Sequence, residues 1–269
     1  MDILPARTRP YRRRIRRQHK PAEASFHGGY RSFRPCLRWE FGFTCAACLL
    51  HEGDLIESGA ARSGLMTIEH IEPQSTAVER ANEYQNCLYL CRYCNTSRSD
   101  WPRVNGEGHR LLDPTAAVWA DHFGIDGDRL APAPGDMDAR YTHEVYDLDD
   151  PRKVFLRRER RERIEDALVL VREGPEERRF LLQKAIEIEA RGGPDDAAEA
   201  ARLRRGAELH RLSIARAWKD LRRYRAVPED HDKTCRCSQS RALRLPAALR
   251  EQVVELPEPL EGAESAPLR

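Results

Sequence analysis

The spacing of hydrophobic positions changes about halfway along the 269-residue chain. Before residue 114, apolar residues form short runs, such as 66–71 and 88–90, separated by polar residues, glycines and prolines. Short apolar runs of this kind predict β-strands, and Pro73 ends the first strand because proline donates no ladder hydrogen bond. We expect the two runs to pair, and a helix to follow from residue 91 to about residue 101. The predicted order is strand, strand, helix.

Beyond Pro151 the apolar residues recur at three- and four-residue intervals, which predicts helices. Glycine and proline end helices, so we expect a first helix to end at Gly174-Pro175, a second to span 176–191 and a third to span 194–226. Their apolar positions form stripes that pack either against each other or against a partner protein. These stripes comprise Phe180, Leu181, Ile186, Ile188, Leu203, Leu209, Leu212, Ile214 and Trp218.

These patterns, together with shifts in composition, predict an α+β protein with a small folded core and a mainly α-helical C-terminal extension. The tail after Pro228 is rich in proline, glutamate and arginine, which predicts disorder. Five segments are expected: a basic disordered arm (1–25), the folded core (26–114), an accessory segment packed on it (115–152), a helical region (153–228) and a largely disordered tail (229–269).

Composition limits the classes of protein to consider. Charged residues make up 33% of the chain and the mean hydropathy is −0.72, which indicates that much of the chain is solvated helix or tail. No apolar run reaches the roughly 18 residues that a membrane span requires, and the arginine-rich N-terminus has no apolar stretch behind it. The sequence therefore predicts neither a membrane span nor a secretory signal, and a cytoplasmic location.

The net charge of +2 conceals a strongly basic N-terminal arm. Such a block repels itself, stays unfolded without a polyanion and neutralises phosphates without reading sequence. A solvated tail with no dedicated role explains the same composition. The sequence of the arm alone does not distinguish such a tail from a segment that binds nucleic acid. The arginines expected to contact nucleic acid are Arg12, Arg13, Arg14, Arg16 and Arg17.

Four of the eight cysteines form two C-x-x-C pairs, Cys45 with Cys48 and Cys91 with Cys94. Two such pairs offer the four thiolates that structural zinc prefers, in a closed site that leaves no open position for catalysis. Zinc here would pin the ends of a segment of about forty residues and remove loop entropy that a small core cannot offset. Ordinary buried thiols are the alternative interpretation.

Several polar residues lie within the segment between the pairs or directly after it. Glu69 and His70 end the first predicted strand, Asn86 precedes the second, and Asn95 directly follows Cys94. The runs E-H-I-x-P and N-C-L-Y-L-C-R-Y-C-N-T-S-R resemble the zinc-binding members of the HNH endonuclease family. The resemblance covers about residues 45–101, roughly a fifth of the chain, and implies a zinc-stapled ββα-metal fold.

The resemblance also implies a role for each of these residues. His70 would be the general base that activates water, and Asn86 would hold the loop and the imidazole in position. Glu69 and Asn95 would bind a catalytic Mg²⁺ or Mn²⁺ ion, since hard cations prefer oxygen ligands. Glu69 stands where aspartate is commoner in the family, which places the carboxylate one methylene farther from the backbone. Arg98, one turn beyond Asn95, is expected either to contact a phosphate or simply to be solvated.

The main interpretation is a metal-dependent endonuclease that acts on DNA, with RNA left open. The resemblance extends to bacterial enzymes of phage defence and mobile elements, which suggests such a role. The alternative interpretation, from a different class of function, is a zinc-binding module that binds nucleic acid or protein without catalysis. Such a module would have no use for Glu69, His70 and Asn95, so their presence favours the enzyme. A protein partner for the C-terminal helices is compatible with both.

Overall fold

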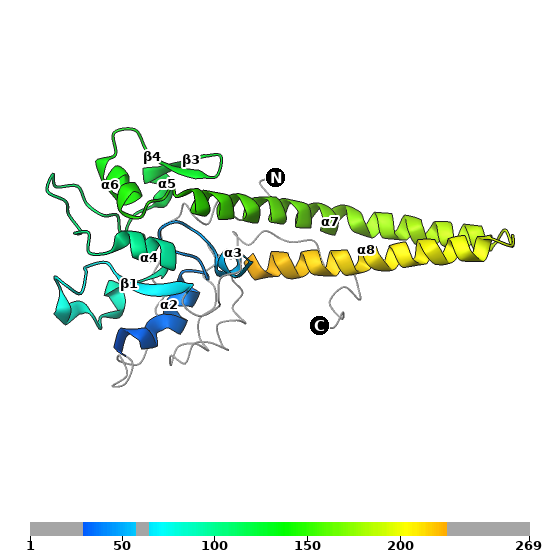
Figure 1. Ribbon diagram of the computed structural model, residues 1–269, viewed down its shortest axis with the longest axis horizontal. Helices are drawn as coiled ribbons and strands as arrows, with labels where there is room; N and C mark the ends of the chain where they lie inside the picture. The colour runs from blue at the N-terminus through cyan, green and yellow to red at the C-terminus, as the bar shows by residue number, and fades with distance from the viewer. Residues whose placement is uncertain (1–28, 58–64, 225–269) are drawn as a thin grey trace. The chain divides into compact units, whose positions relative to one another are not determined.

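The computed structural model describes residues 29–57 and 65–224 (Figure 1). The expected basic arm and C-terminal tail lie outside the described residues, as do the arginines at 12–17. The described residues divide into two compact units, and the boundary along the chain falls between Arg160 and Arg161, inside one long helix. The sequence placed the start of the helical region at residue 153, whereas the structure assigns the first turns of this helix to the first unit.

A two-stranded antiparallel sheet and the helix after it form the centre of the first unit. Strand β1 (Met66–His70) pairs with β2 (Cys87–Cys91), with Met66 opposite Cys91 and His70 opposite Cys87. Helix α4 (Arg92–Arg98) follows β2 directly and packs against both strands. The predicted order of strand, strand and helix is confirmed, and so is the α+β class. Five short elements surround this motif: η1 (Gly29–Phe33), α2 (Arg34–Glu40), α3 (Glu52–Glu57), η2 (Val78–Arg80) and η3 (Tyr84–Asn86).

The segment after residue 114 adds a second small layer to the same core. It contains α5 (Trp119–His122), the antiparallel pair β3 (Phe123–Asp126) and β4 (Arg129–Pro132), and α6 (Met137–Val145). Their buried residues belong to the hydrophobic cluster that also contains the residues of β2, because each of these elements is too short to bury a core alone. These residues include Trp119, Phe123, Leu130, Ala139 and Tyr141.

The second unit is a helical hairpin, formed by residues 161–189 of α7 (Pro151–Glu189) and by α8 (Asp196–Tyr224). The predicted end of a helix at Gly174-Pro175 is wrong, since α7 runs through both residues. Proline inside a helix costs about 3 kcal/mol. Packing against α8 opposes this cost, because the missing side chain of Gly174 leaves room for Ile214. The packing of α7 against α8 thus overrides the tendency of Gly174-Pro175 to end a helix.

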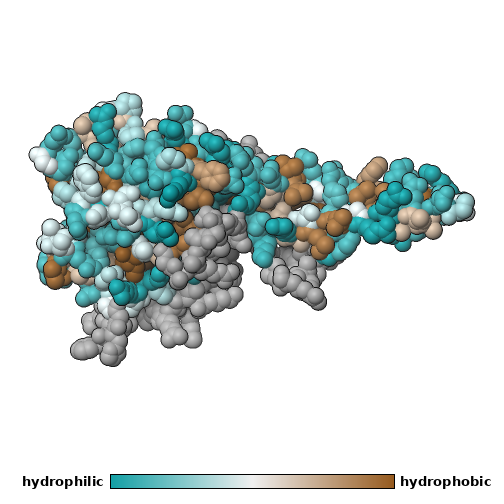
Figure 2. All heavy atoms as spheres, in the orientation of Figure 1, coloured by the Kyte–Doolittle hydropathy of each residue, from teal (hydrophilic) through white to brown (hydrophobic). Residues whose placement is uncertain are grey.

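Only one face of each hairpin helix is buried. The buried positions lie three or four residues apart, or at multiples of seven, which places them on one helix face. They include Ile164, Ala167, Val171, Ala185 and Ile188 in α7, and Ala200, Ala207, Ile214, Ala217 and Leu221 in α8. Of the predicted apolar stripes, Ile188, Ile214 and Trp218 are buried, whereas Phe180, Ile186, Leu209 and Leu212 are exposed. Figure 2 shows apolar side chains between hydrophilic ones along this hairpin. Two helices bury only their shared seam, so part of each predicted stripe stays in solvent.

None of the helices that the structure describes is long and apolar enough to cross a membrane.

Two glycines of the hairpin provide a matched test of its packing. A Cβ at Gly174 would lie 2.9 Å from Cγ1 of Ile214, whereas a Cβ at Gly206 would lie 3.6 Å from Leu181, an ordinary contact. Gly206→Ala should raise the free energy of unfolding by about 0.5 to 1 kcal/mol through helix propensity. Gly174→Ala gains the same propensity but overpacks the seam, at a cost of about 1 to 3 kcal/mol. Denaturant unfolding followed by circular dichroism measures both, and equal stabilisation would contradict this packing.

Candidate functional site

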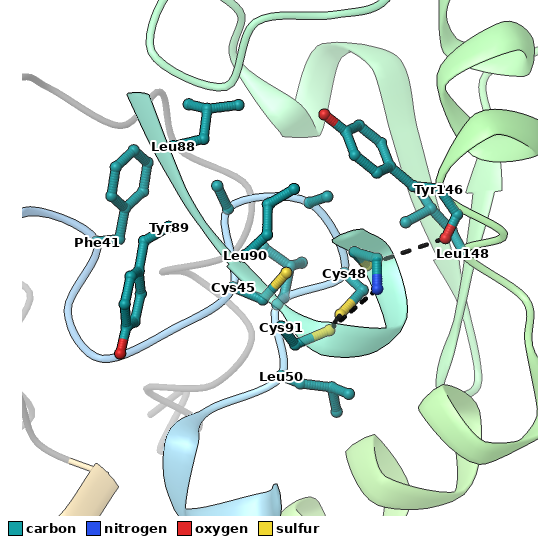
Figure 3. Packing of buried hydrophobic residues seen from close by; sticks show 14 of the residues in the cluster. Phe41, Cys45, Cys48, Leu50, Leu88, Tyr89, Leu90, Cys91, Tyr146 and Leu148 are labelled. Carbon is teal, nitrogen blue, oxygen red and sulfur yellow. Dashed lines mark hydrogen bonds between the residues drawn. The ribbon is translucent and has the colours of Figure 1, made fainter. Parts of the chain in front are cut away.

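The four cysteines of the two C-x-x-C pairs gather into one buried cluster, called here the four-cysteine cluster. The sulfur atoms of Cys45, Cys48, Cys91 and Cys94 all lie within 4.8 Å of one another, and each residue is fully buried. The Cys48 and Cys91 sulfurs are 3.6 Å apart, close to the roughly 3.8 Å edge of a tetrahedral zinc–thiolate site. Figure 3 shows three of these cysteines packed among Leu50, Leu90 and Leu148.

Main-chain hydrogen bonds hold both halves of the cluster in place. The Cys45 N–H donates to Leu50 O (2.8 Å), which closes the first knuckle, and the Ala46 N–H donates to Tyr89 O on β2 (2.8 Å). The second knuckle lies at the start of α4, where the Cys94 N–H donates to the Cys91 sulfur (3.4 Å). Since Cys91 also ends β2, the cluster fixes the strand and the helix together.

The chemistry of the cluster suits a zinc ion. None of the four cysteines forms a disulfide. Burial raises the pKa of the Cys94 thiol well above its usual value. Burial acts in the same direction on Cys45, but hydrogen bonds with the neighbouring cysteines outweigh it and lower the pKa of that thiol. The cluster thus already favours one thiolate, and a divalent cation that binds all four sulfurs replaces the remaining protons. With all four ligand positions supplied by protein, the role of zinc here is structural.

The His70 side chain occupies a specific buried position at the end of β1. The residue is only 3% exposed, and the Tyr30 ring packs edge-on against the imidazole with ring centroids 4.7 Å apart. Nε2 lies 2.9 Å from Ala81 O. A carbonyl oxygen only accepts hydrogen bonds, so Nε2 carries the proton of the neutral ring and Nδ1 keeps its lone pair. The exposed side chain of Gln74 covers the ring, with its Nε2 3.3 Å from His70 Nδ1.

Glu69 lies beside His70 and is partly buried. One carboxylate oxygen accepts the His70 backbone N–H at 2.8 Å. Burial raises the pKa of Glu69, while the His70 N–H and the positive charge of Arg98 act in the opposite direction. The structure therefore places this carboxylate in a low-dielectric setting near a cation, where its electrostatic interactions are strong.

Asn86 joins the two ends of the loop between β1 and β2. Its side-chain Oδ1 accepts the Glu72 N–H at 2.9 Å, and its Nδ2 lies 3.2 Å from both Glu72 O and Arg80 O. Its own carbonyl accepts the Ile71 N–H at 2.8 Å. The residue is 1% exposed, so these hydrogen bonds satisfy polar groups that water cannot reach. Asn86 therefore fixes the main chain immediately next to Ala81, the residue whose carbonyl orients His70.

A charged cluster that the sequence analysis did not anticipate lies on the same loop. The Glu72 carboxylate bridges two guanidinium groups, Arg80 at 2.5 Å and Arg103 at 2.7 Å. The Arg80 hydrogen bond lowers the pKa of Glu72, which keeps the carboxylate ionised. Glu72 is the variable position of the E-H-I-x-P run, and Arg103 lies beyond α4, so no local pattern indicated that they meet.

Asn95 and Arg98 lie one turn apart on α4, and neither is simply solvated. The Asn95 Oδ1 atom is buried and has no hydrogen-bond partner among the described residues. Arg98 is fully buried, and its Nη1 donates to Trp101 O, while its Nε and Nη2 have no partner within the same part of the chain. Arg98 is therefore not the solvated side chain that one of the two expectations described. The chain turns tightly after α4, where the Trp101 N–H donates to Arg98 O at 3.1 Å.

Comparison with known proteins finds a family match within the first unit. Residues 45–100 match the family model described as HNH endonuclease, and this match spans both cysteine pairs, β1, β2 and α4. The chain therefore carries an HNH endonuclease domain of the kind that binds zinc through four cysteines. Such a domain implies a nucleic-acid substrate. No curated protein and no solved structure matches the chain.

Metal analysis tests the four-cysteine cluster. The purified chain should hold about one zinc ion, and Cys91→Ser should lose it because three thiolates bind zinc far more weakly than four. Cys36→Ala is the matched control, since Cys36 is also buried but lies outside the cluster. Equal zinc contents in the two variants would contradict the assignment.

Loss of the Asn86 side chain should destabilise the loop. Asn86→Ala leaves the Glu72 N–H and two carbonyls unpaired in a buried place, which should lower the free energy of unfolding by about 2 to 3 kcal/mol. Asn82→Ala is the control, because Asn82 is exposed and accepts one bond, from the Tyr30 N–H, so its loss should cost less than about 1 kcal/mol. Denaturant unfolding measures both, and similar losses would count against a special role for Asn86.

Proposed function

We propose that the HNH domain hydrolyses phosphodiester bonds in DNA, with His70 as the general base. The observation that carries this proposal is the bond between His70 Nε2 and Ala81 O. It leaves Nδ1 as the basic nitrogen, and a neutral imidazole of fixed tautomer is suited to take a proton from water as the water attacks phosphorus. The His70 ring is thus oriented by a loop that Asn86 holds.

Movement of the Gln74 side chain would uncover part of the His70 ring. Tyr30 packs against this ring, and Nε2 of the exposed Gln74 lies 3.3 Å from each of its two nitrogens. Rotation of an exposed glutamine is a small change on a fast timescale. A substrate phosphate and its water would then reach the imidazole without rearrangement of the fold.

Glu69 and Asn95 fit a catalytic Mg²⁺ or Mn²⁺ ion. The unpartnered Asn95 Oδ1 and the carboxylate of Glu69 are hard oxygen donors, and α4 packs against β1, which carries Glu69. A divalent ion bound there would stabilise negative charge on the phosphate and on the departing oxygen. The buried Arg98 adds positive charge close to Glu69, so its proposed role is to position that carboxylate rather than to contact the substrate.

Positive groups around the loop support a polyanionic substrate. Arg80 and Arg103 are partly exposed, and each shares the Glu72 carboxylate with the other. Phosphate oxygens bind guanidinium groups in the same bidentate manner as carboxylates, so a nucleic-acid backbone can compete with Glu72 for them. The N-terminal arginines 12–17 would add affinity that depends on salt. Roles in phage defence or mobile elements, and a protein partner for the helices, stay predictions.

A plasmid-nicking assay in Mg²⁺ separates the nuclease from a non-catalytic zinc module. His70→Ala and Asn95→Ala should each lose about 10² to 10⁴-fold in nicking rate, while both retain zinc and native circular dichroism. His109→Ala is the control, because His109 pairs with Glu107 and has no part in the proposed chemistry, so this variant should nick like the wild type. A parallel assay on RNA identifies the preferred substrate.

The non-catalytic alternative makes the opposite prediction for the same variants. Plasmid binding without any nicking, unchanged in His70→Ala, would favour that alternative. Nicking that survives in both site variants and disappears only with zinc would also refute His70 as the base.

A further inference from the structure

The first turns of α7 bring two positively charged side chains into the core of the first unit. Lys153 is 0% exposed and Arg157 is 7% exposed, although lysine and arginine are rarely buried without a partner of opposite charge. Burying a charge is costly unless a countercharge lies nearby, because dipoles alone replace only part of the lost hydration. These two residues therefore require an explanation that the proposed nuclease chemistry does not provide.

Lys153 is bound entirely by main-chain carbonyl groups. Its Nζ donates to Tyr146 O at 2.6 Å and to Asp147 O at 2.8 Å. No carboxylate of the described residues lies within ion-pair distance of this ammonium group. The Tyr146 carbonyl oxygen also lies 3.9 Å from the Cys94 sulfur, so one oxygen atom separates the ammonium from the four-cysteine cluster.

Arg157 has the same kind of environment on another side of the cluster. Its Nη1 donates to Cys48 O at 3.3 Å, its Nη2 to Leu148 O at 3.0 Å and its Nε to Asp128 O at 2.7 Å. All three acceptors are again neutral carbonyl groups. The Asp149 carboxylate also interacts favourably with Arg157, but its ion-pair contacts are with Arg129 at 3.8 Å and His143 at 3.6 Å.

The four-cysteine cluster can supply the missing countercharge. Four thiolates and one Zn²⁺ carry two net negative charges, and two buried cations lie directly around them. We propose that Lys153 and Arg157 form a charge-compensating shell for the zinc–thiolate centre. This shell couples zinc binding to the docking of the first turns of α7.

The coupling works in both directions. Zinc removes the unfavourable burial of two unpaired cations, so it should stabilise the docked start of α7. The cations in turn stabilise the thiolate form, so they should raise the affinity for zinc by the same factor. This inference does not depend on the nuclease proposal, because a non-catalytic zinc domain would need the same compensation.

Zinc release from the full-length chain tests the proposal. Lys153→Met and Arg157→Met remove charge but keep an apolar stem of similar length, and each should release zinc to a chromophoric chelator about 10 to 100-fold faster than the wild type. Arg152→Met is the control, because Arg152 is an exposed cation on the same turn of α7. Lys153→Arg keeps the charge and should release zinc nearly as slowly as the wild type.

Three results would overturn the proposal. The first is that both methionine variants release zinc at the wild-type rate. The second is that Lys153→Arg releases zinc as fast as Lys153→Met, which would show that side-chain shape and not charge matters.

The third result comes from unfolding the methionine variants with and without chelator. The proposal expects these variants to lose more stability, relative to the wild type, in the zinc-loaded state than in the zinc-free state. Equal losses in both states would indicate a purely structural role. If Lys153→Met does not fold, Arg157→Met provides the same tests.

Discussion

The convergence of four sulfur atoms constrains the rest of the first unit. Cys48 and Cys91 are 43 residues apart in the chain, yet their sulfurs lie 3.6 Å from each other. Closing a loop of that length costs conformational entropy that a two-stranded sheet and a two-turn helix cannot offset. Because Cys91 ends β2 and also caps α4, one metal site fixes the strand, the helix and the ends of the loop that holds His70.

Within that frame, buried polar contacts define the geometry of the HNH site. Asn86 binds the main chain of the loop at Glu72 and Arg80, and the neighbouring carbonyl of Ala81 orients His70. Buried donors and acceptors are expensive to leave unpaired, so this network tolerates few alternative arrangements. The Asn95 oxygen and two nitrogens of Arg98 are buried without partners in the part of the chain that the structure describes, and an unpartnered oxygen beside paired groups is suited to a ligand.

Two groups of charged side chains also contribute to the structure of the first unit. The first turns of α7 place Lys153 and Arg157 beside the cluster through carbonyl groups alone, while Glu72 on the opposite loop joins Arg80 and Arg103. In both arrangements, carbonyl or carboxylate oxygens hold the cations in place. The first arrangement also ties the start of α7 to the core that contains the four-cysteine cluster, although α7 continues into the second unit.

The sequence by itself determined the features that depend on spacing along the chain. The two C-x-x-C pairs indicated a four-thiolate cluster, and the order of apolar runs predicted two strands and a helix, because ligand spacing and strand patterning are local properties. The tertiary structure alone decided how distant residues meet. It buried Arg98, paired Glu72 with Arg103, carried α7 through Gly174-Pro175 and left Phe180 in solvent. Each outcome depends on which surfaces pack together, and the sequence pattern of one segment does not reveal which other segment it packs against.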